Sequence, residues 1–187
     1  MKKCMALAVL LTATLGTSAF LPAPPALAPA EARIEWLTIE QAYERCQRQP
    51  RKVLVDVYTD WCGWCKTMDR TTFTNPAVAA YINRTFYAVK LNAEQRGTIR
   101  LGDQKFGYIP HGRKGYNELA AGFLGGKMSF PTTVFLDERM ALIQPIPGFH
   151  KPDAFHRILT YFGGNYHKKQ PWEKYEKDTY AKLYSKR

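Results

Sequence analysis

Apolar and polar positions along the chain follow two patterns, short apolar runs and longer stretches with helical spacing. Residues 53–58 and 86–91 are mostly apolar runs of β-branched or aromatic side chains, which is typical of buried strands. Between them, Asn75 and Pro76 form a good start for a helix, which we expect to continue through Tyr81. A strand, a helix and a second strand predict a right-handed parallel crossover, with the two strands side by side.

The same patterns extend the expected domain on both sides of this crossover. Ile39, Ala42, Tyr43 and Cys46 lie on one stripe of a helix that we expect over residues 38–49. A buried free cysteine behaves as a small hydrophobic side chain, so we expect Cys46 to pack in the core without a redox role. Further elements are expected as strands over residues 132–136 and 141–146, a turn at 137–138 between them, and a helix over 153–162.

Two cysteines three positions apart, Cys62 and Cys65, closely follow the first predicted strand. At the start of a helix, the unpaired backbone N–H groups and the positive end of the dipole favour a thiolate. This lowers the thiol pKa and makes Cys62 the expected nucleophile, with Cys65 covered one turn further in. A zinc site would need a second ligand pair, and c-type haem would need a histidine where Lys66 stands, so we expect no metal and no cofactor. An inert structural disulfide is the plain alternative, but so short a loop contributes little stabilisation.

An acid, Asp56, interrupts the first predicted strand, where a charge is costly unless it is paired or functional. The parallel crossover places Lys90 of the second strand beside it. Burial should raise the pKa of Asp56, while the charge of Lys90 should oppose that rise. A purely structural Asp56–Lys90 pair is the alternative to a catalytic acid.

The segment from Asp56 to Lys66, with its W-C-G-W-C sequence, resembles the active site of the thioredoxin superfamily, especially its extracytoplasmic thioredoxin-like branch. Residues 129–133, residues 89–92 and Gly148 match further family segments in the same order. The resemblance implies an α/β thioredoxin fold, a central mixed sheet flanked by helices, over about residues 36–162. It also implies that the peptide bond before Pro131 is cis and that the loop around Pro131 faces the dithiol. An insertion precedes this loop in the sequence.

The resemblance further implies a function, that of a thiol–disulfide oxidoreductase with a redox-active disulfide between Cys62 and Cys65. Asp56, supported by Lys90, would take and return the proton of Cys65. Similarity to reducing relatives leads us to expect that the protein reduces disulfides, while oxidation and isomerisation stay open. The expected partners are protein disulfides or dithiols and a redox donor or acceptor protein. A thioredoxin-like binding module or chaperone-type scaffold without turnover is the alternative. The residues expected to contact a partner are Trp61, Gly63, Trp64, Phe130, Pro131 and Gly148.

Residues 1–30 have the layout of a secretory signal, with Lys2 and Lys3, an apolar core and an A-x-A pattern at 26–28. We therefore expect an exported protein, in the periplasm or another extracytoplasmic space. An uncleaved anchor is the alternative and the only case in which we expect membrane contact. Outside the cytoplasm a dithiol is either an oxidant or is kept reduced by a dedicated donor.

Two segments fall outside the family pattern. One is an insertion inside the expected domain, residues 31–164, and the other is the tail that follows this domain. Residues 92–127 read as a long glycine-punctuated loop with a short helix over 116–124, either a lip beside the active site or a decorative surface loop. Residues 165–187 form a basic, aromatic tail in a chain of net charge +11. Since nucleic acid is not expected for an exported protein, we expect Trp172 and Tyr175 to pack on the domain surface, followed by a helical basic end.

Overall fold

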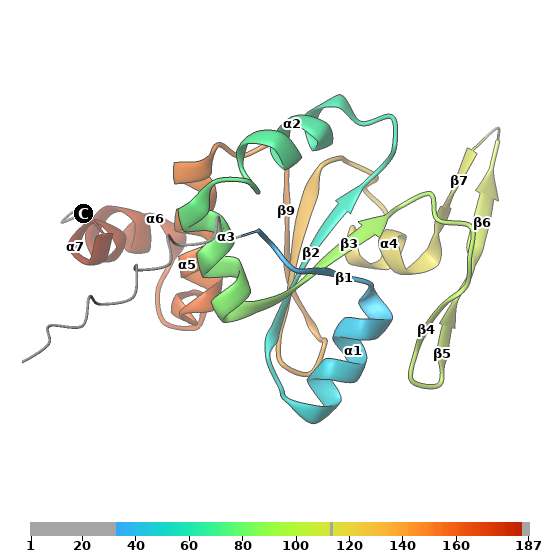
Figure 1. The fold of residues 1–187 in the computed structure, drawn as a ribbon, viewed down its shortest axis with the longest axis horizontal. Helices are drawn as coiled ribbons and strands as arrows, with labels where there is room; N and C mark the ends of the chain where they lie inside the picture. Colours follow the sequence, from blue (N-terminus) through green and yellow to red (C-terminus); the bar gives the residue numbers. More distant parts are fainter. Residues whose placement is uncertain (1–32, 113, 185–187) are drawn as a thin grey trace, which may run out of the picture. The chain divides into compact units, whose positions relative to one another are not determined.

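A computed structural model describes residues 33–112 and 114–184 (Figure 1). The expected secretory signal over residues 1–30 lies outside the described residues. The elements, in chain order, are β1 (Trp36–Leu37), α1 (Ile39–Arg48), β2 (Lys52–Tyr58), α2 (Gly63–Thr71), α3 (Pro76–Thr85), β3 (Phe86–Asn92), β4 (Ile99–Leu101), β5 (Gln104–Phe106), β6 (Tyr108–His111), β7 (Lys114–Asn117), α4 (Glu118–Phe123), β8 (Thr132–Leu136), β9 (Leu142–Pro147), α5 (Pro152–Gly163), the 3-10 turn η1 (Tyr166–Lys168), α6 (Trp172–Lys174), the π-helical segment η2 (Tyr175–Tyr180) and α7 (Ala181–Tyr184).

The main sheet has five strands in the order β1-β3-β2-β8-β9. β1, β3 and β2 run parallel, while β8 and β9 are antiparallel to their neighbours, so the expected mixed sheet is confirmed. In the register of β2 and β3, Asp56 stands opposite Lys90, which confirms their predicted adjacency. β2 is the central strand, and the segment that carries the two cysteines leaves from its carboxyl end.

Helices cover both faces of this sheet, and the apolar residues of β2 divide between the two faces because side chains alternate along a strand (Figure 1). Val53, Val55 and Val57 pack with α1 and α4 in one core cluster. Leu54 belongs to the other cluster, which contains Met68 of α2 and apolar residues of α3 and α5. By alternation, Asp56 faces the same side as Leu54, the side that α2 covers.

The helices predicted around the crossover are confirmed, together with the signals that begin them. At α1, the side chain of Thr38 accepts from the backbone of Gln41 and the Gln41 side chain accepts in return, a capping box. Asn75 caps α3, with Pro76 in its first turn, and the helix extends four residues beyond the predicted end. Cys46 is buried, and its Sγ donates to the Arg51 carbonyl at 3.3 Å, so the predicted core packing is confirmed.

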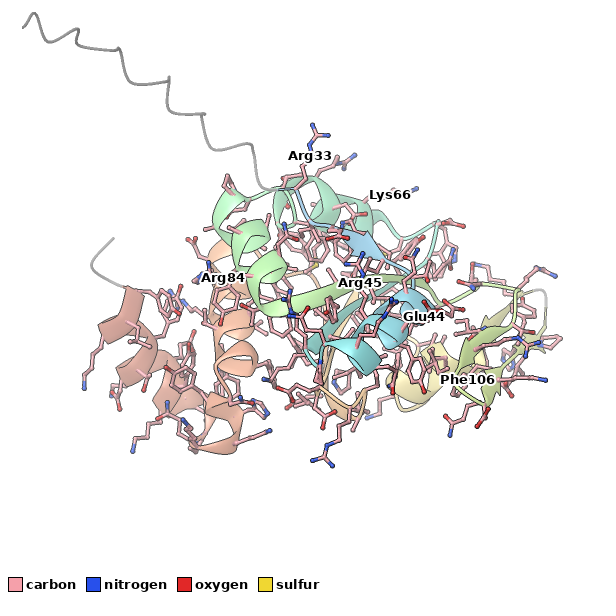
Figure 2. The ribbon with its side chains drawn as sticks, turned by 60° about the horizontal axis from the view of Figure 1, so that its bottom comes forward. Arg33, Glu44, Arg45, Lys66, Arg84 and Phe106 are labelled. Atoms are coloured by element: carbon pink, nitrogen blue, oxygen red, sulfur yellow. A yellow bond between two sulfur atoms is a disulfide. The ribbon has the colours of Figure 1, made fainter. Side chains whose placement is uncertain are left out.

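The loop prediction for residues 92–127 is wrong over much of its length, because two small hairpins form there, β4–β5 and β6–β7. Their strands have three or four residues, too short to leave an apolar pattern in the sequence. Phe106 lies on the first hairpin and packs against the α1–α4 core (Figure 2). Asn117, which we expected inside a helix, ends β7 and caps α4, since its side chain accepts from the Leu119 N–H.

Residues 165–184 form helical turns that pack against α5 (Figure 1). The helical end predicted there is confirmed, but Tyr175 lies deeper than on the surface. It is completely buried, and its hydroxyl donates to Thr160 Oγ1 at 2.8 Å. Trp172 meets the Tyr161 ring edge to face. None of the described helices is both long and apolar enough to cross a membrane.

Candidate active site: a disulfide at the start of a helix

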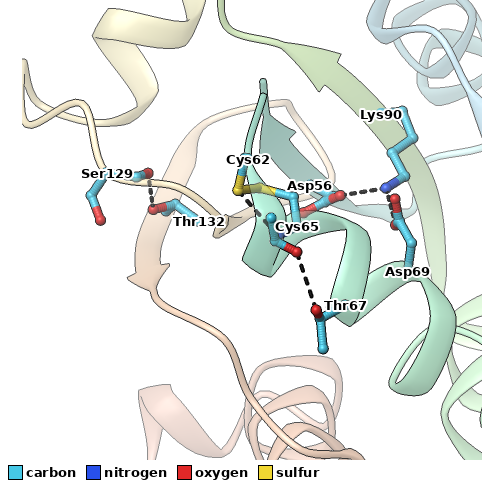
Figure 3. Close-up of a disulfide and its surroundings, with 9 residues drawn as sticks. Asp56, Cys62, Cys65, Thr67, Asp69, Lys90, Ser129 and Thr132 are labelled. Atoms are coloured by element: carbon cyan, nitrogen blue, oxygen red, sulfur yellow. Dashed lines mark hydrogen bonds and ion pairs between the residues drawn. A yellow bond between two sulfur atoms is a disulfide. The ribbon is translucent and has the colours of Figure 1, made fainter. Parts of the chain in front are cut away.

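Cys62 and Cys65 form a disulfide at the start of α2 (Figure 3). Cys62 is the N-cap residue, and its Sγ accepts a hydrogen bond from the Cys65 backbone N–H at 3.0 Å. A negative charge on Cys62 Sγ would keep this donor and would also gain from the positive end of the helix dipole. In the disulfide state both residues are buried, Cys62 at 5% exposure and Cys65 at 2%. The difference between the two sulfurs therefore lies in their place on the helix rather than in their exposure.

Two tryptophans beside the disulfide are largely exposed, Trp61 at 57% and Trp64 at 63%. The Trp61 ring meets Phe130 edge to face with centroids 6.0 Å apart, and the Trp64 ring lies 5.4 Å from Phe149. Gly63 between them is exposed as well, and Lys66 points away from the ribbon (Figure 2). Exposed aromatic rings of this size favour contact with another molecule.

The loop before β8 contains a cis peptide bond between Phe130 and Pro131. The Gly148 N–H donates to the Pro131 carbonyl at 2.8 Å, and Gly148 has φ +98°, a conformation that favours glycine. Trp64, Phe130, Pro131, Gly148 and Phe149 together line a shallow pocket of about 220 Å³. The structure thus brings the sequence-predicted contact residues Trp64, Phe130, Pro131 and Gly148 together.

Beneath this surface lies a group of three charged side chains. Asp56, at 1% exposure, accepts from Lys90 Nζ through Oδ2 at 2.6 Å, and Lys90 also pairs with Asp69 of α2 (Figure 3). The second carboxylate oxygen of Asp56 is buried without a hydrogen-bond partner among the described residues. Burial raises the pKa of Asp56 to about 6, and the charge of Lys90 works against that rise, as the sequence predicted. Burial works to lower the pKa of Lys90, but the two acids outweigh it and raise that pKa.

Asp69 is the member of this group that sequence reasoning missed. It lies four residues after Cys65, so both project from the same face of α2, and that spacing could have identified it. The pairs with Lys90 therefore connect β2 and β3 to the helix that carries both cysteines. Sequence reasoning also missed the aromatic rings around Lys90 Nζ, with centroids 4.8 to 5.2 Å away: Trp36, Tyr58 and Phe73.

The inserted segment 92–127 borders the Trp61 side of the site, a relation that the sequence left open. Trp61 Nε1 donates to Glu94 Oε1 at 3.0 Å, and Lys114 Nζ of β7 lies 4.3 Å from the Trp61 ring centroid. His111 of β6 is exposed. Among residues 33–112 and 114–184, no three His, Cys, Asp or Glu side chains gather as ligands for a metal ion.

Sequence comparisons place residues 19–144 within the profile of one family, described as Thioredox_DsbH, protein of unknown function (DUF255). The uncharacterized protein B0495.5 of Caenorhabditis elegans is 28% identical over 77 residues, 41% of this chain and 11% of that protein. The thiol:disulfide interchange protein DsbD of Pectobacterium atrosepticum is 40% identical over 37 residues, 20% of this chain and 6% of that protein. The similarity thus spans a small part of the length of both relatives.

Solved structures resemble this chain over most of its length at low sequence identity. A thioredoxin from Thermus thermophilus is 19% identical, with a TM-score of 0.53 over 74% of this chain and 94% of its own. A putative disulphide-isomerase from Bacteroides thetaiotaomicron is 20% identical, with a TM-score of 0.51 over 77% of this chain and 100% of its own. These similarities confirm the predicted thioredoxin fold.

Proposed function

Because this chain belongs to the Thioredox_DsbH family and has a disulfide at the start of α2 of a thioredoxin fold, we propose that it is an exported thiol–disulfide oxidoreductase that reduces partner proteins. The observation that supports the proposal most strongly is the position of the disulfide at the start of α2. The helix start stabilises a thiolate on Cys62, and exposed aromatic rings surround it. Export rests on the signal-like pattern of residues 1–30.

The proposed reaction begins with both cysteines reduced. The Cys62 thiolate attacks one sulfur of a partner disulfide, and the other partner sulfur leaves as a thiolate and takes up a proton. The Cys65 thiolate then attacks Cys62 Sγ, which breaks the mixed disulfide, releases the second partner thiol and forms the Cys62–Cys65 disulfide. Two electrons pass to the partner in each cycle, and a dithiol donor protein must reduce Cys62–Cys65 again.

In this reaction Asp56 is the proposed base that takes the proton of Cys65 before the second attack. A carboxyl group with a pKa of about 6 is ionised near neutral pH and is basic enough to accept a proton there. Lys90 would offset the charge of Asp56 while that charge is buried. On release of the proton, Asp56 would return to its ionised state for the next cycle.

The partner would bind as an extended segment along the Phe130–Pro131 loop, over the surface formed by Trp61, Gly63 and Trp64. Extended segments pair their backbone with an exposed edge and place alternate side chains in flanking pockets. The shallow pocket beside Trp64 and Gly148 suits an apolar side chain, because aromatic and proline carbon atoms dominate its lining.

The test compares Cys65→Ser with Cys62→Ser, each in the otherwise unchanged chain. We expect Cys65→Ser, once reduced, to accumulate mixed disulfides with partner proteins, because Cys62 can attack but nothing resolves the product. We expect Cys62→Ser to form none and to lose turnover in an insulin reduction assay with dithiothreitol as donor. Non-reducing electrophoresis and mass spectrometry identify the trapped proteins.

Equal trapping by the two variants would contradict the assigned roles of the cysteines. An unchanged chain that is fully reduced but reduces neither insulin nor the trapped partners would instead favour a binding module. The assay run in the other direction, on reduced and unfolded substrate, decides whether the protein oxidises thiols more readily than it reduces disulfides.

A further inference from the structure

The Trp61 side of the disulfide is formed by the inserted segment and differs in character from the Trp64 side. Three contacts hold the Trp61 ring: the hydrogen bond to Glu94, the Lys114 ammonium over its face and the edge of Phe130. On the Trp64 side, the Trp64 ring packs against Phe149 and lines a pocket with Pro131. Phe130 lies between the two sides and lines the pockets on both.

The hairpin that carries Lys114 is fixed to the core. The Asn117 backbone N–H donates to the Ala93 carbonyl at 2.8 Å, directly after β3. The buried Asn117 amide donates to the carbonyls of Gly97 (3.3 Å) and Phe106 (3.4 Å). Because these bonds join both hairpins to the end of β3, the position of Lys114 next to Trp61 is part of the folded domain.

A pocket of about 190 Å³ opens between this hairpin and the rings of Trp61 and Phe130, and we call it the Lys114 pocket. Its apolar part includes Trp61, Tyr116, Met128 and Phe130, and its polar part consists of Glu94, His111 and Lys114. The pocket therefore combines aromatic rings with two groups that can donate hydrogen bonds, His111 and Lys114, and one acceptor, Glu94.

The charge of Lys114 is the part of this pocket that is open to a ligand. The side chain is 64% exposed, and its distance to Glu94 Oε1 is 3.9 Å, long for an ion pair. That same oxygen already accepts from Trp61, which reduces what it offers to Lys114. Residues 93–127 carry six Lys or Arg against three acids, so this segment has a net positive charge.

We propose that the Lys114 pocket binds an Asp or Glu side chain of the partner, within two residues of the partner's disulfide cysteine. The inference rests on the proposed function, because the partner segment lies over Phe130 with its cysteine at Cys62. In an extended segment, residues two apart project to the same side about 7 Å apart. On this proposal the carboxylate would pair with the Lys114 ammonium, and the Trp61 ring, 4.3 Å from that ammonium, would cover its apolar stem.

The test uses the full chain with Cys65→Ser, so that only the attack by Cys62 is measured. The probes are three peptides of equal length, each with one cysteine joined by a disulfide to thionitrobenzoate and with Glu, Gln or Lys two residues to either side. Attack by Cys62 joins the peptide to the protein and releases the coloured thionitrobenzoate thiolate, the better leaving group. We expect the Glu peptide to react about five-fold faster than the Lys peptide at low salt, and the ratio to fall at high salt.

Two variants then locate the charge that causes this preference. Lys114→Glu should bring the ratio of the Glu to the Lys peptide to one or below. Lys105→Glu, an equal change of net charge on the other hairpin and outside the pocket, should leave the ratio near five.

The outcomes separate the inference from the proposed function. If the Gln peptide reacts with the protein no faster than with free cysteine, the proposed function fails. If it reacts fast but the three peptides do not differ, or if Lys105→Glu abolishes the preference as fully as Lys114→Glu, the Lys114 pocket is refuted and the oxidoreductase remains.

Discussion

The two sides of the disulfide differ in what they expose. On the inner side, three charges meet: Asp56 is buried, while the side chains of Lys90 and Asp69 are 23% and 42% exposed. On the outer side, Trp61 and Trp64 present large rings to solvent. Burial strengthens electrostatic effects and shifts pKa values, whereas exposed rings contribute contact area. The comparison teaches that substitutions inside should alter the pH dependence of the reaction, and substitutions outside should alter the affinity for partners.

The largest expected effect comes from Asp56→Asn, which keeps the shape of the side chain but removes the base. We expect the second step, the attack by Cys65, to slow about ten-fold above neutral pH, where Asp56 is ionised. Below about pH 6 the unchanged chain also carries a protonated Asp56, so the two proteins should converge. Quenched single-turnover reactions of the reduced proteins, followed across pH, measure this step.

Asp103→Asn serves as the control for that experiment, since Asp103 is exposed in the β4–β5 hairpin. If the rate of the second step depends on pH in the same way in the unchanged chain and in Asp56→Asn, Asp56 has only a structural role, as the partner of Lys90. The buried charge of Asp56 would then have no influence on the pH dependence of the reaction.

A smaller effect is expected on the outer side, from Trp64→Ala. Loss of the ring removes apolar contact with a bound partner, so KM for a protein disulfide should rise about five-fold, with kcat and the pH profile nearly unchanged. Steady-state kinetics with insulin or a trapped partner measure both parameters. Leu142→Ala, at another exposed apolar residue, should leave KM unchanged. A fall in kcat with a displaced pH profile would show that the ring also acts on the sulfur chemistry.

The smallest effect is expected from Asp69→Asn. The negative charge of Asp69 raises the pKa of Asp56, so its removal should lower that pKa. The acidic limb of the single-turnover profile should move to lower pH, because Asp56 then stays ionised in more acidic solution. Asp69→Glu keeps the charge and should leave the limb in place. A move to higher pH would contradict the electrostatic link between α2 and Asp56.

The features that could be predicted from the sequence are each encoded in a short stretch of consecutive residues. The apolar run of β2, the Asn75-Pro76 helix start and the Cys62–Cys65 spacing are each visible in a few consecutive residues. The adjacency of Asp56 and Lys90 followed from the parallel crossover, since matched strands place equivalent positions opposite each other.

The parts that escaped prediction depend on contacts between distant segments. Glu94 and Lys114 meet Trp61 only because two hairpins fold back on the end of β3, and strands of three or four residues carry no periodicity. The sequence predicts that Tyr175 packs on the domain surface, and its complete burial follows from the packing of residues 165–184 on α5, which no local pattern shows.

The burial of Tyr175 has a practical consequence for anyone who shortens this chain. A version cut at Gly164 would look complete by comparison with a minimal thioredoxin, yet it would lack a ring that fills the core beside Thr160. Deletion of a buried aromatic side chain costs about 3–5 kcal/mol, a large part of the 5–15 kcal/mol that stabilises a typical domain. The helical turns after Gly164 therefore stabilise the domain through this ring.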